Sequence, residues 1–399
     1  MNGTLHVVGA GMAGLACAVA AARAGTRVVL HEAAGQAGGR CQSFHDHCLG
    51  RLIDNGTHLV LGANRATLAF SRAVGGDEAM EAAPAVFPFV DLIGGDRWVV
   101  TPGRPAAGLG ELSRALGLPW IGEEQTVAAR LGGTASYARL WRPLCEAILD
   151  TAPEEASARL FARVLRKVLL GGPAAMTPWL FPAGLSAAFV APALATLTLF
   201  GTVIRLQHRL MAASGESLVF EGDAVTLGPE DRAVLALPPW ATAQVFPNDT
   251  PALPTRTIVN AHFRCTWVPP GQTRFLGITG GVAQWLSWRG DVLSVTVSAA
   301  ERLAVLPNDE IAALLWADAA RALDLPAALP PFRVLKERRA TLAHTPDVLR
   351  RRPGPTTRFP RIFLAGDWIA SPWPCTIEAA VSSGLSAARL ALGRPNLTF

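Results

Sequence analysis

The chain of 399 residues is hydrophobic rather than charged: half of its residues are hydrophobic, 17% are charged, and the formal net charge is +5. So much apolar side chain is enough to build buried cores, which excludes a disordered or collagen-like protein. Its only lysines are Lys167 and Lys336, and the arginines are spread thinly, so no nucleic-acid partner is expected. The length predicts two or three domains.

The six cysteines lack CxxC spacing and are too few for a disulfide scaffold in a chain of this length. We expect them to be reduced and mostly buried, as in a cytoplasmic protein, and we expect no metal site. The N-terminus enters a predicted strand by Leu5 without a basic segment and a hydrophobic run before it. No signal peptide is therefore expected.

The first 31 residues predict a strand, a helix and a second strand. Short apolar runs at 5–8 and 27–30 flank an Ala-rich helical pattern at 12–24, which together indicate a βαβ unit and a parallel sheet. From 68 to 170 the chain alternates helical stretches with Pro/Gly breaks. Further predicted strands cover 203–206, 217–220, 233–237, 258–263, 292–297 and 361–365, and further helices cover 309–323 and 376–392.

A GxGxxG motif lies between the first strand and the first helix. Gly9 permits the tight turn, Gly11 lets the backbone approach a pyrophosphate, and Gly14 lets helix and strand pack closely. Glu32 ends the second strand 18 residues after Gly14, where it can accept hydrogen bonds from a ribose. The alternative is a glycine-rich turn in an ordinary α/β domain, which the spacing of Glu32 disfavours.

Two more segments favour a flavin over a nicotinamide. Glycines and Arg40 follow Glu32 directly within residues 35–40, and Gly366-Asp367 close a predicted strand. The helix that starts at Thr376 would direct its N-terminus at the pyrimidine edge of a flavin and stabilise its reduced, negative form. The alternative is a docking helix. Its small residues suit close packing in both cases: Ala380, Ser383, Gly384 and Ala387.

With these motifs joined, the chain resembles the FAD-dependent amine oxidase and phytoene desaturase superfamily, and within it the hydroxysqualene dehydroxylases. The segments that carry the narrower resemblance are 53–62, 141–145, 284–286, 337–341, 365–368 and 376–378. The resemblance implies an α/β fold, in which a Rossmann-type FAD-binding domain is interleaved with an α+β substrate domain. We expect the FAD-binding domain at 1–70, 201–250 and 350–399, and the substrate domain at 71–200 and 251–349.

The resemblance also implies FAD contacts, with Thr376 and Ile377 at the flavin ring. The full set is Gly9, Gly11, Ala13, Gly14, Glu32, Gly39, Arg40, Gly56, Leu210, Gly366, Asp367, Thr376 and Ile377. Cys375 stands where the family usually has a small residue. A covalent flavin bond at this thiol is one interpretation; the favoured one is that the thiol simply replaces Ala or Ser.

The implied activity is the reduction of hydroxysqualene to squalene in squalene and hopanoid biosynthesis. Loss of the hydroxyl needs a proton donor, a dry pocket for a cation and a hydride from reduced FAD. Asp54 and His58 are the candidate donors, and for both the alternative is structural hydrogen bonding of the turn at Gly56. Four aromatic faces are candidates to stabilise the cation: Trp285, Trp288, Trp368 and Trp373. The electron donor stays open, with NAD(P)H as one candidate.

Three rival functions are a carotenoid-type desaturase, an amine oxidase and a non-catalytic prenyl-lipid-binding protein. Against amine oxidation, Asn260 aligns with the lysine that holds a water near the flavin in amine oxidases, and Tyr137 is the single tyrosine available for an aromatic pair. A binding protein of this fold would lose the flavin motifs, which are complete here. A desaturase would run a related reaction in the oxidative direction.

A membrane is the other expected partner, because a C30 isoprenoid is almost insoluble in water. Residues 171–204 carry no charge, but Pro182 and Pro192 make a straight transmembrane helix a poor fit. This stretch either lines the substrate domain or touches lipid.

The segment just before that stretch, from residue 158, predicts a basic amphipathic helix. Its basic residues are Arg159, Arg163, Arg166 and Lys167. Such a helix lies in lipid headgroups or packs on the core as an ordinary surface helix. We expect peripheral, monotopic attachment at the cytoplasmic face, within 158–204.

Overall fold

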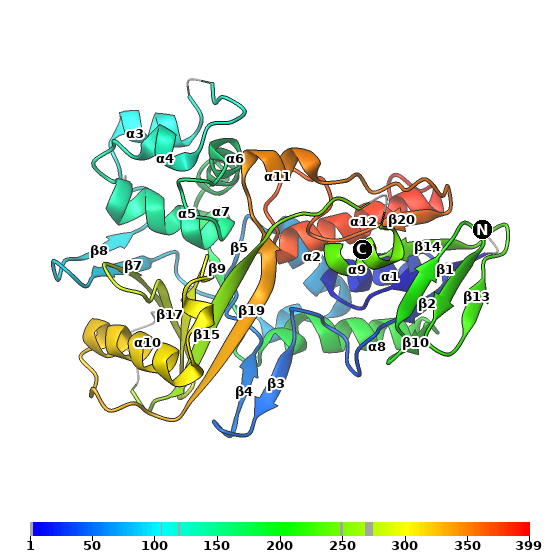
Figure 1. Ribbon diagram of the computed structural model, residues 1–399, viewed down its shortest axis with the longest axis horizontal. Coiled ribbons are helices and arrows are strands. Elements are labelled where there is room, and N and C mark those ends of the chain that lie inside the picture. The colour runs from blue at the N-terminus through cyan, green and yellow to red at the C-terminus, as the bar shows by residue number, and fades with distance from the viewer. Residues whose placement is uncertain (1–2, 105, 119, 248–249, 268–273) are drawn as a thin grey trace.

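The computed structural model describes residues 3–104, 106–118, 120–247, 250–267 and 274–399, and Figure 1 shows them gathered around two separate sheets. One sheet has five parallel strands in the order β10-β2-β1-β14-β20. Its strands are β1 (Thr4–Val8), β2 (Arg27–His31), β10 (Val203–Arg205), β14 (Arg232–Leu235) and β20 (Ile362–Leu364). The predicted βαβ unit is confirmed, with α1 (Met12–Arg23) between β1 and β2.

Small residues let two helices pack closely beside this sheet. A Cβ at Gly384 of α12 (Ile377–Leu392) would lie 2.1 Å from the carbonyl oxygen of Ala13 in α1. No side chain larger than hydrogen fits at that crossing. The run of small residues in α12 therefore serves helix packing, as expected from the sequence.

Part of the uncharged stretch after residue 171 packs beside α1 rather than lining the substrate domain, and its contact with lipid stays a prediction. It breaks into α7 (Pro173–Met176), β9 (Pro178–Leu180), η3 (Ser186–Val190) and α8 (Ala191–Leu199). Phe189 and Leu197 are fully buried in one core with Leu15 of α1 and Phe70 of α2 (Arg65–Val74). This part of the stretch therefore belongs with the five-stranded sheet and its helices, because its apolar side chains complete the core beside α1. Within the described ranges, no helix has the length and apolar character needed to cross a membrane.

The second sheet has seven strands in the order β19-β15-β18-β17-β16-β7-β8. They are β7 (Phe87–Asp91), β8 (Arg97–Val100), β15 (Thr255–Arg264), β16 (Phe275–Thr279), β17 (Trp285–Arg289), β18 (Val292–Val297) and β19 (Phe332–Leu342). Alternation along β15 separates two faces. Val259, Ala261 and Phe263 pack with α10 (Asn308–Leu323), whereas Asn260 and His262 lie on the opposite, polar face.

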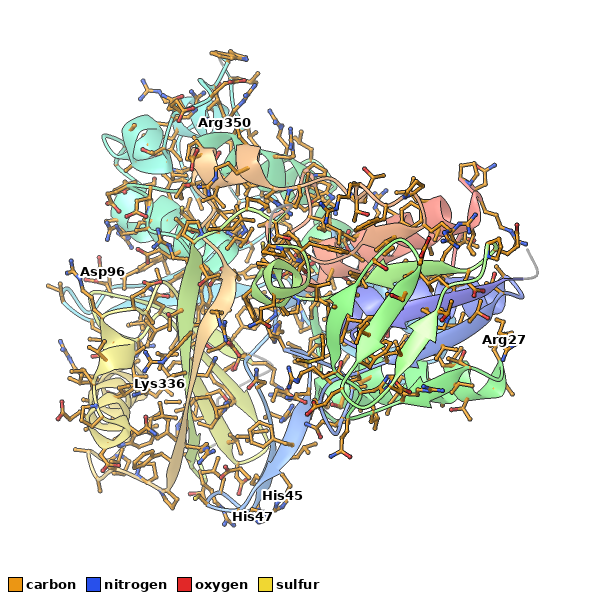
Figure 2. The ribbon with its side chains drawn as sticks, turned by 45° about the vertical axis from the view of Figure 1, so that its right-hand side comes forward. Arg27, His45, His47, Asp96, Lys336 and Arg350 are labelled. Carbon is orange, nitrogen blue, oxygen red and sulfur yellow. The ribbon has the colours of Figure 1, made fainter. Side chains whose placement is uncertain are left out.

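A group of helices covers one end of the seven-stranded sheet (Figure 1). It contains α3 (Leu109–Ala115), α4 (Val127–Leu131), η2 (Tyr137–Trp141), α5 (Arg142–Leu149) and α6 (Ala158–Leu169). Leu160, Phe161 and Leu165 of α6 are buried in the core of this group. The ion pair of Arg350 with Glu124 joins α11 (Pro346–Arg351) to it, and Figure 2 shows Arg350 beside these helices.

Short elements connect the two halves. The hairpin of β3 (Ser43–Asp46) and β4 (Arg51–Asp54) projects along the second sheet, with His45 and His47 at its free end (Figure 2). The remaining elements are η1 (Asp77–Ala79), η4 (Leu303–Val305), β5 (Val60–Leu61), β6 (Glu81–Ala82), β11 (Leu210–Ala213), β12 (Ser217–Phe220), β13 (Ala224–Thr226) and α9 (Pro239–Val245).

Candidate functional site

The glycines of the GxGxxG turn meet three different constraints. Gly9 has a positive φ of 102°, and its amide donates to the carbonyl of His31 at 2.7 Å. A Cβ at Gly14 would lie 1.8 Å from the oxygen of Gly9, so this position must stay bare for the fold itself. A Cβ at Gly11 would meet no protein atom within 4 Å. Gly11 thus leaves open space in front of the first-turn amides of α1, where a phosphate fits.

The carboxylate of Glu32 holds the same turn from the end of β2. It accepts hydrogen bonds from the amide of Ala10 at 2.7 Å and from that of Ala34 at 2.8 Å. The amide of His208 donates to the carbonyl of Glu32 at 2.8 Å, and Leu210 begins β11 two residues later. Carboxylate oxygens accept more than one hydrogen bond each, so ribose hydroxyls can join without displacing these amides.

Arg40 and Asp367 bring the two ends of the chain together. Nη2 of Arg40 donates to Oδ1 of Asp367 at 2.8 Å, and Nη1 donates to the carbonyl of Ala340. The Asp367 carboxylate, which is almost fully buried, raises the pKa of Arg40. A Cβ at Gly39, where φ is 56°, would lie 3.3 Å from the Cα of Gly11. The pair therefore lies beside the glycine turn.

The start of α12 is held from several sides. Thr376 caps it by accepting from the amide of Ala379 at 3.3 Å, and Gly366, just after β20, donates its amide to Ser383 at 3.0 Å. The Glu378 carboxylate forms an ion pair with Lys167 at 2.8 Å. These contacts fix the position of Thr376 and Ile377, the residues expected at a flavin ring.

Cys375, directly before Thr376, is buried. Its amide donates to Nε2 of His344 at 2.8 Å, and burial raises the pKa of its thiol to about 12. A buried, protonated thiol is a poor nucleophile. The environment thus favours a thiol that replaces Ala or Ser over one bonded to flavin.

Asp54 occupies a structural position between three segments. It accepts from Nη1 of Arg289 at 2.6 Å, from the hydroxyl of Ser43 at 2.5 Å and from the amide of Leu185 at 3.1 Å. Both oxygens are engaged, and an ion-paired carboxylate has acceptors only. This environment favours a structural role for Asp54 over the role of proton donor.

His58 bonds back to its own turn. Its Nδ1 lies 2.8 Å from the carbonyl of Gly56, so Nδ1 carries the proton and donates. Burial lowers the pKa of His58, which keeps the ring neutral at pH 7 with Nε2 as an acceptor. Asp54 ends β4 and His58 lies in the turn that follows it. The proton-donor role of both stays a prediction, and these contacts favour the structural alternative.

Asn260 lies directly behind that loop on the polar face of the sheet. A Cβ at Gly56 would lie 3.2 Å from its Nδ2, which explains the bare position. Oδ1 of Asn260 accepts from the hydroxyl of Thr296 at 2.8 Å. The two lysines lie elsewhere: Lys167 pairs with Glu378, and Nζ of Lys336 donates to the carbonyl of Leu306 at 2.6 Å.

The four candidate tryptophans differ in what they face. Trp368 is buried, and its Nε1 donates to the carbonyl of Leu237 at 2.9 Å, so it is a core residue. The ring of Trp373 lies 4.1 Å from the Lys167 ammonium, which uses that aromatic face. Trp285 packs edge-on against Phe89. The cation role of the four tryptophans stays a prediction, which the environments of Trp368 and Trp373 disfavour.

Sequence reasoning missed a set of acids at the end of α5. Glu146 lies in the last turn of α5, and Asp150 directly follows the helix as its C-cap. Nε2 of Gln284 donates to Glu146 at 3.3 Å, and the hydroxyl of Ser298 donates to Asp150 at 2.6 Å. Burial raises the pKa of Glu146, and it raises that of Asp150 to about 6. No local pattern in the sequence pointed to these two acids, because their partners come from segments more than 130 residues away.

Family models and solved structures agree with this geometry. A model of an NAD(P)-binding Rossmann-like domain matches residues 7–73, and one of a flavin containing amine oxidoreductase matches residues 121–392. Wild-type putrescine oxidase bound to putrescine has a TM-score of 0.72 at 18% identity, over 99% of this chain and all of that one. Cyclohexylamine oxidase from Brevibacterium oxydans IH-35A has a TM-score of 0.73 at 18% identity, over 99% of this chain and all of its own. These likenesses establish the fold.

Sequence relatives narrow the family. The hydroxysqualene dehydroxylase of Sinorhizobium fredii (strain NBRC 101917 / NGR234) is 39% identical over 99% of this chain and all of its own. That of Rhodopseudomonas palustris (strain ATCC BAA-98 / CGA009) is 39% identical over 98% and 99% of the two chains. That of Zymomonas mobilis is 32% identical over 97% and 98%. This chain is therefore an FAD-dependent oxidoreductase of the flavin-containing amine oxidoreductase family, and within it belongs to the hydroxysqualene dehydroxylases.

Proposed function

We propose that this protein reduces hydroxysqualene to squalene, replacing a hydroxyl group with hydrogen. The observation that carries the proposal is the 39% identity to curated dehydroxylases over nearly the whole of both chains. The open space at Gly11 beside the Arg40–Asp367 pair supports a cradle for the cofactor. Bound FAD, once reduced, supplies the hydride.

We propose that the expected FAD contacts divide the ligand between them. The α1 amides beyond Gly11 receive the diphosphate, and Glu32 receives the adenosine ribose. Arg40, oriented by Asp367, adds positive charge beside the diphosphate. The capped N-terminus of α12 at Thr376 faces the flavin ring, where its dipole stabilises negative charge.

We propose positioning roles for Asp54 and His58 in place of the acid role. Asp54 ties the β3–β4 hairpin to β17 through Arg289, and His58 stiffens the Gly56 turn in front of Asn260. Both keep the loop shape that closes the flavin side of the substrate space. The proton donor is then another residue.

The lysine positions support a reductase over an amine oxidase. Asn260 takes the place where amine oxidases hold a lysine-bound water, and the two lysines are engaged with Glu378 and Leu306. A desaturase remains the second candidate, because it would use the same fold and a related lipid in the oxidative direction.

We further propose the two-part division of the chain and a peripheral lipid contact. The five-stranded sheet draws its strands from 4–31, 203–235 and 362–364, and the seven-stranded sheet from 87–100 and 255–342, which supports the division. The basic residues of α6 have protein partners, such as Glu123 for Arg159. We therefore move the lipid contact to the neighbouring exposed apolar residues, Leu118, Trp120 and Leu170.

The lipid contact has a direct test in vesicle binding. Anionic phosphatidylglycerol vesicles should sediment the protein better than phosphatidylcholine vesicles, because the Arg159 guanidinium lies 5.5 Å from the centre of the Trp120 ring. Trp120→Asp should reduce binding. Equal sedimentation of wild type and variant would contradict this surface.

One experiment tests the function itself. The holoprotein is reduced anaerobically, hydroxysqualene is added, and the recovery of the oxidised flavin spectrum is followed together with lipid analysis. We expect reoxidation with formation of squalene. If the alcohol leaves the flavin reduced while squalene reduces the oxidised enzyme, the protein is a desaturase.

A further inference from the structure

Two carboxylates at the end of α5 form a hydrogen-bonded network with the second sheet. Ser298 donates its hydroxyl to Asp150 at 2.6 Å and its amide to Oε1 of Gln284 at 2.7 Å. Gln284 in turn donates its Nε2 to Glu146 at 3.3 Å. Asp150 ends α5 in the left-handed region, with φ at 46°, and its amide donates to the carbonyl of Glu146 at 2.9 Å. Its carboxylate therefore has a defined position rather than a free one.

A single imidazole ring links this network to the start of α12. Nδ1 of His344 lies 2.6 Å from the carbonyl of Leu149, the residue before Asp150. Nε2 of the same ring accepts from the amide of Cys375 at 2.8 Å. Because a carbonyl only accepts, Nδ1 must donate, and one neutral tautomer satisfies both contacts. The His344 ring thus connects the residue before Asp150 to the residue before Thr376, where the flavin ring is proposed.

On its other side Asp150 adjoins the polar face of the sheet. Ser298 follows β18 two residues beyond Thr296, whose hydroxyl donates to Asn260 at 2.8 Å. Asn260 lies behind the Gly56 turn. Asp150 is consequently connected on one side to the start of α12 and on the other to Asn260 behind the Gly56 turn. We propose that both features lie beside the flavin.

The electrostatic setting of Asp150 differs from that of Asp54. The pKa of Asp150 is raised to about 6: burial raises it most, the hydrogen bond from the Ser298 hydroxyl lowers it, and nearby Glu301 raises it. Other titratable groups on the surrounding elements are Glu146 on α5, which Arg142 faces at 3.8 Å, and the neutral His344. Asp54, by contrast, is ion-paired with Arg289 at 2.6 Å. A carboxyl whose pKa is raised toward neutral pH can act as a general acid.

We propose that Asp150 is the general acid that protonates the departing hydroxyl group of the isoprenoid alcohol. This inference rests on the proposed function. The C–O bond breaks and the oxygen takes the Asp150 proton to leave as water. The carbon receives a hydride from the two-electron-reduced flavin, so carbon is reduced and the flavin is oxidised. Asp150 regains its proton from solvent.

The test measures single-turnover reoxidation of the anaerobically reduced holoprotein by hydroxysqualene between about pH 5 and pH 8. The wild-type rate should fall as pH rises through the pKa of Asp150. Asp150→Asn should retain FAD and its melting temperature but react about 10²–10⁴-fold more slowly. Its rate should no longer fall as pH rises through this range. Asp96→Asn, at the exposed β7–β8 turn labelled in Figure 2, is the matched control and should behave as wild type.

Ser298→Ala separates an acid from a merely structural group. Without the Ser298 hydroxyl, which stabilises the Asp150 carboxylate, the pKa of Asp150 should rise. The fall in rate should then occur at higher pH, while the rate at low pH stays unchanged. If Asp150→Asn reacts at the wild-type rate, or if the rate of Ser298→Ala falls at the same pH as that of the wild type, Asp150 is not the general acid. If the wild type itself fails to react with hydroxysqualene, the proposed function is wrong instead.

Discussion

The polar contacts at the glycine turn and those at the seven-stranded sheet are built in different ways. Around the glycine turn, Glu32 binds backbone amides 22 and 2 residues away, and each glycine meets backbone or open space. At the seven-stranded sheet, side chains bind side chains across long separations: 235 residues for Asp54 and Arg289, and 148 for Asp150 and Ser298. Sites built on the backbone can be predicted from short sequence motifs, whereas networks of side chains are known only from the folded structure.

The Arg40–Asp367 pair is an exception to this comparison, because it lies beside the glycine turn and yet joins residues 327 positions apart. Each partner nonetheless belongs to a glycine-containing motif at a strand end. Long separation is thus compatible with recognition when both ends carry a motif. Asp150 and Ser298 carry none.

The largest expected effect is at Gly14. Gly14→Ala would place a methyl 1.8 Å from the Gly9 oxygen, so the backbone must shift, and we expect a loss of about 4 kcal/mol in the free energy of unfolding. Urea unfolding of the apoprotein measures it. Gly11→Ala is the matched control, since its methyl meets no protein atom within 4 Å: it should fold normally but lose FAD. A stable, FAD-free Gly14→Ala protein would contradict this distinction.

Breaking the Asp54 ion pair tests the contacts at the seven-stranded sheet. Arg289→Ala leaves a largely buried carboxylate without its partner; because Arg289 is 28% exposed, we expect a loss of about 2–3 kcal/mol in unfolding free energy. Adding Asp54→Asn should recover part of that loss, as a double-mutant cycle can measure. Should Asp54→Asn alone keep full stability and FAD yet slow reoxidation by hydroxysqualene, the acid role would return to Asp54.

Glu32→Ala should act on the cofactor rather than on the chemistry. We expect FAD binding to weaken by about 2 kcal/mol, the scale of hydrogen bonds to a charged group. Titration of apoprotein with FAD gives the dissociation constant, and the bound flavin should still react. An unchanged dissociation constant would remove Glu32 from the ribose.

The last expected effect is a pH dependence from His344, which is the smallest per unit of pH. Burial lowers the pKa of His344 to about 4, whereas the unfolded chain has a pKa near 6.5, so the unfolded state binds more protons between these values. Its contribution to the free energy of unfolding therefore falls on acidification from 6.5 to about 4, by up to about 1.4 kcal/mol per pH unit. His344→Gln should flatten the acid limb of stability relative to wild type. Equal slopes would mean that His344 protonates freely in the fold.

The sequence by itself determined the glycine turn and the helices beside it. The GxGxxG spacing predicted the turn between β1 and α1, and the Ala-rich periodicity predicted α1 and α12 within one or two residues. These predictions succeeded because a close backbone approach allows glycine alone, and because helix and strand periodicities are local properties of the chain.

Only the tertiary structure decided the rest. The uncharged stretch after 171 predicted a tunnel lining or a lipid contact, yet Phe189 and Leu197 pack against α1. Asp54 and Asp150 are the same residue type, and no local pattern states that one meets Arg289 and the other Ser298. The partner, the depth of burial and hence the proton affinity of a carboxyl depend on segments far apart in sequence, which only the folded chain brings into contact.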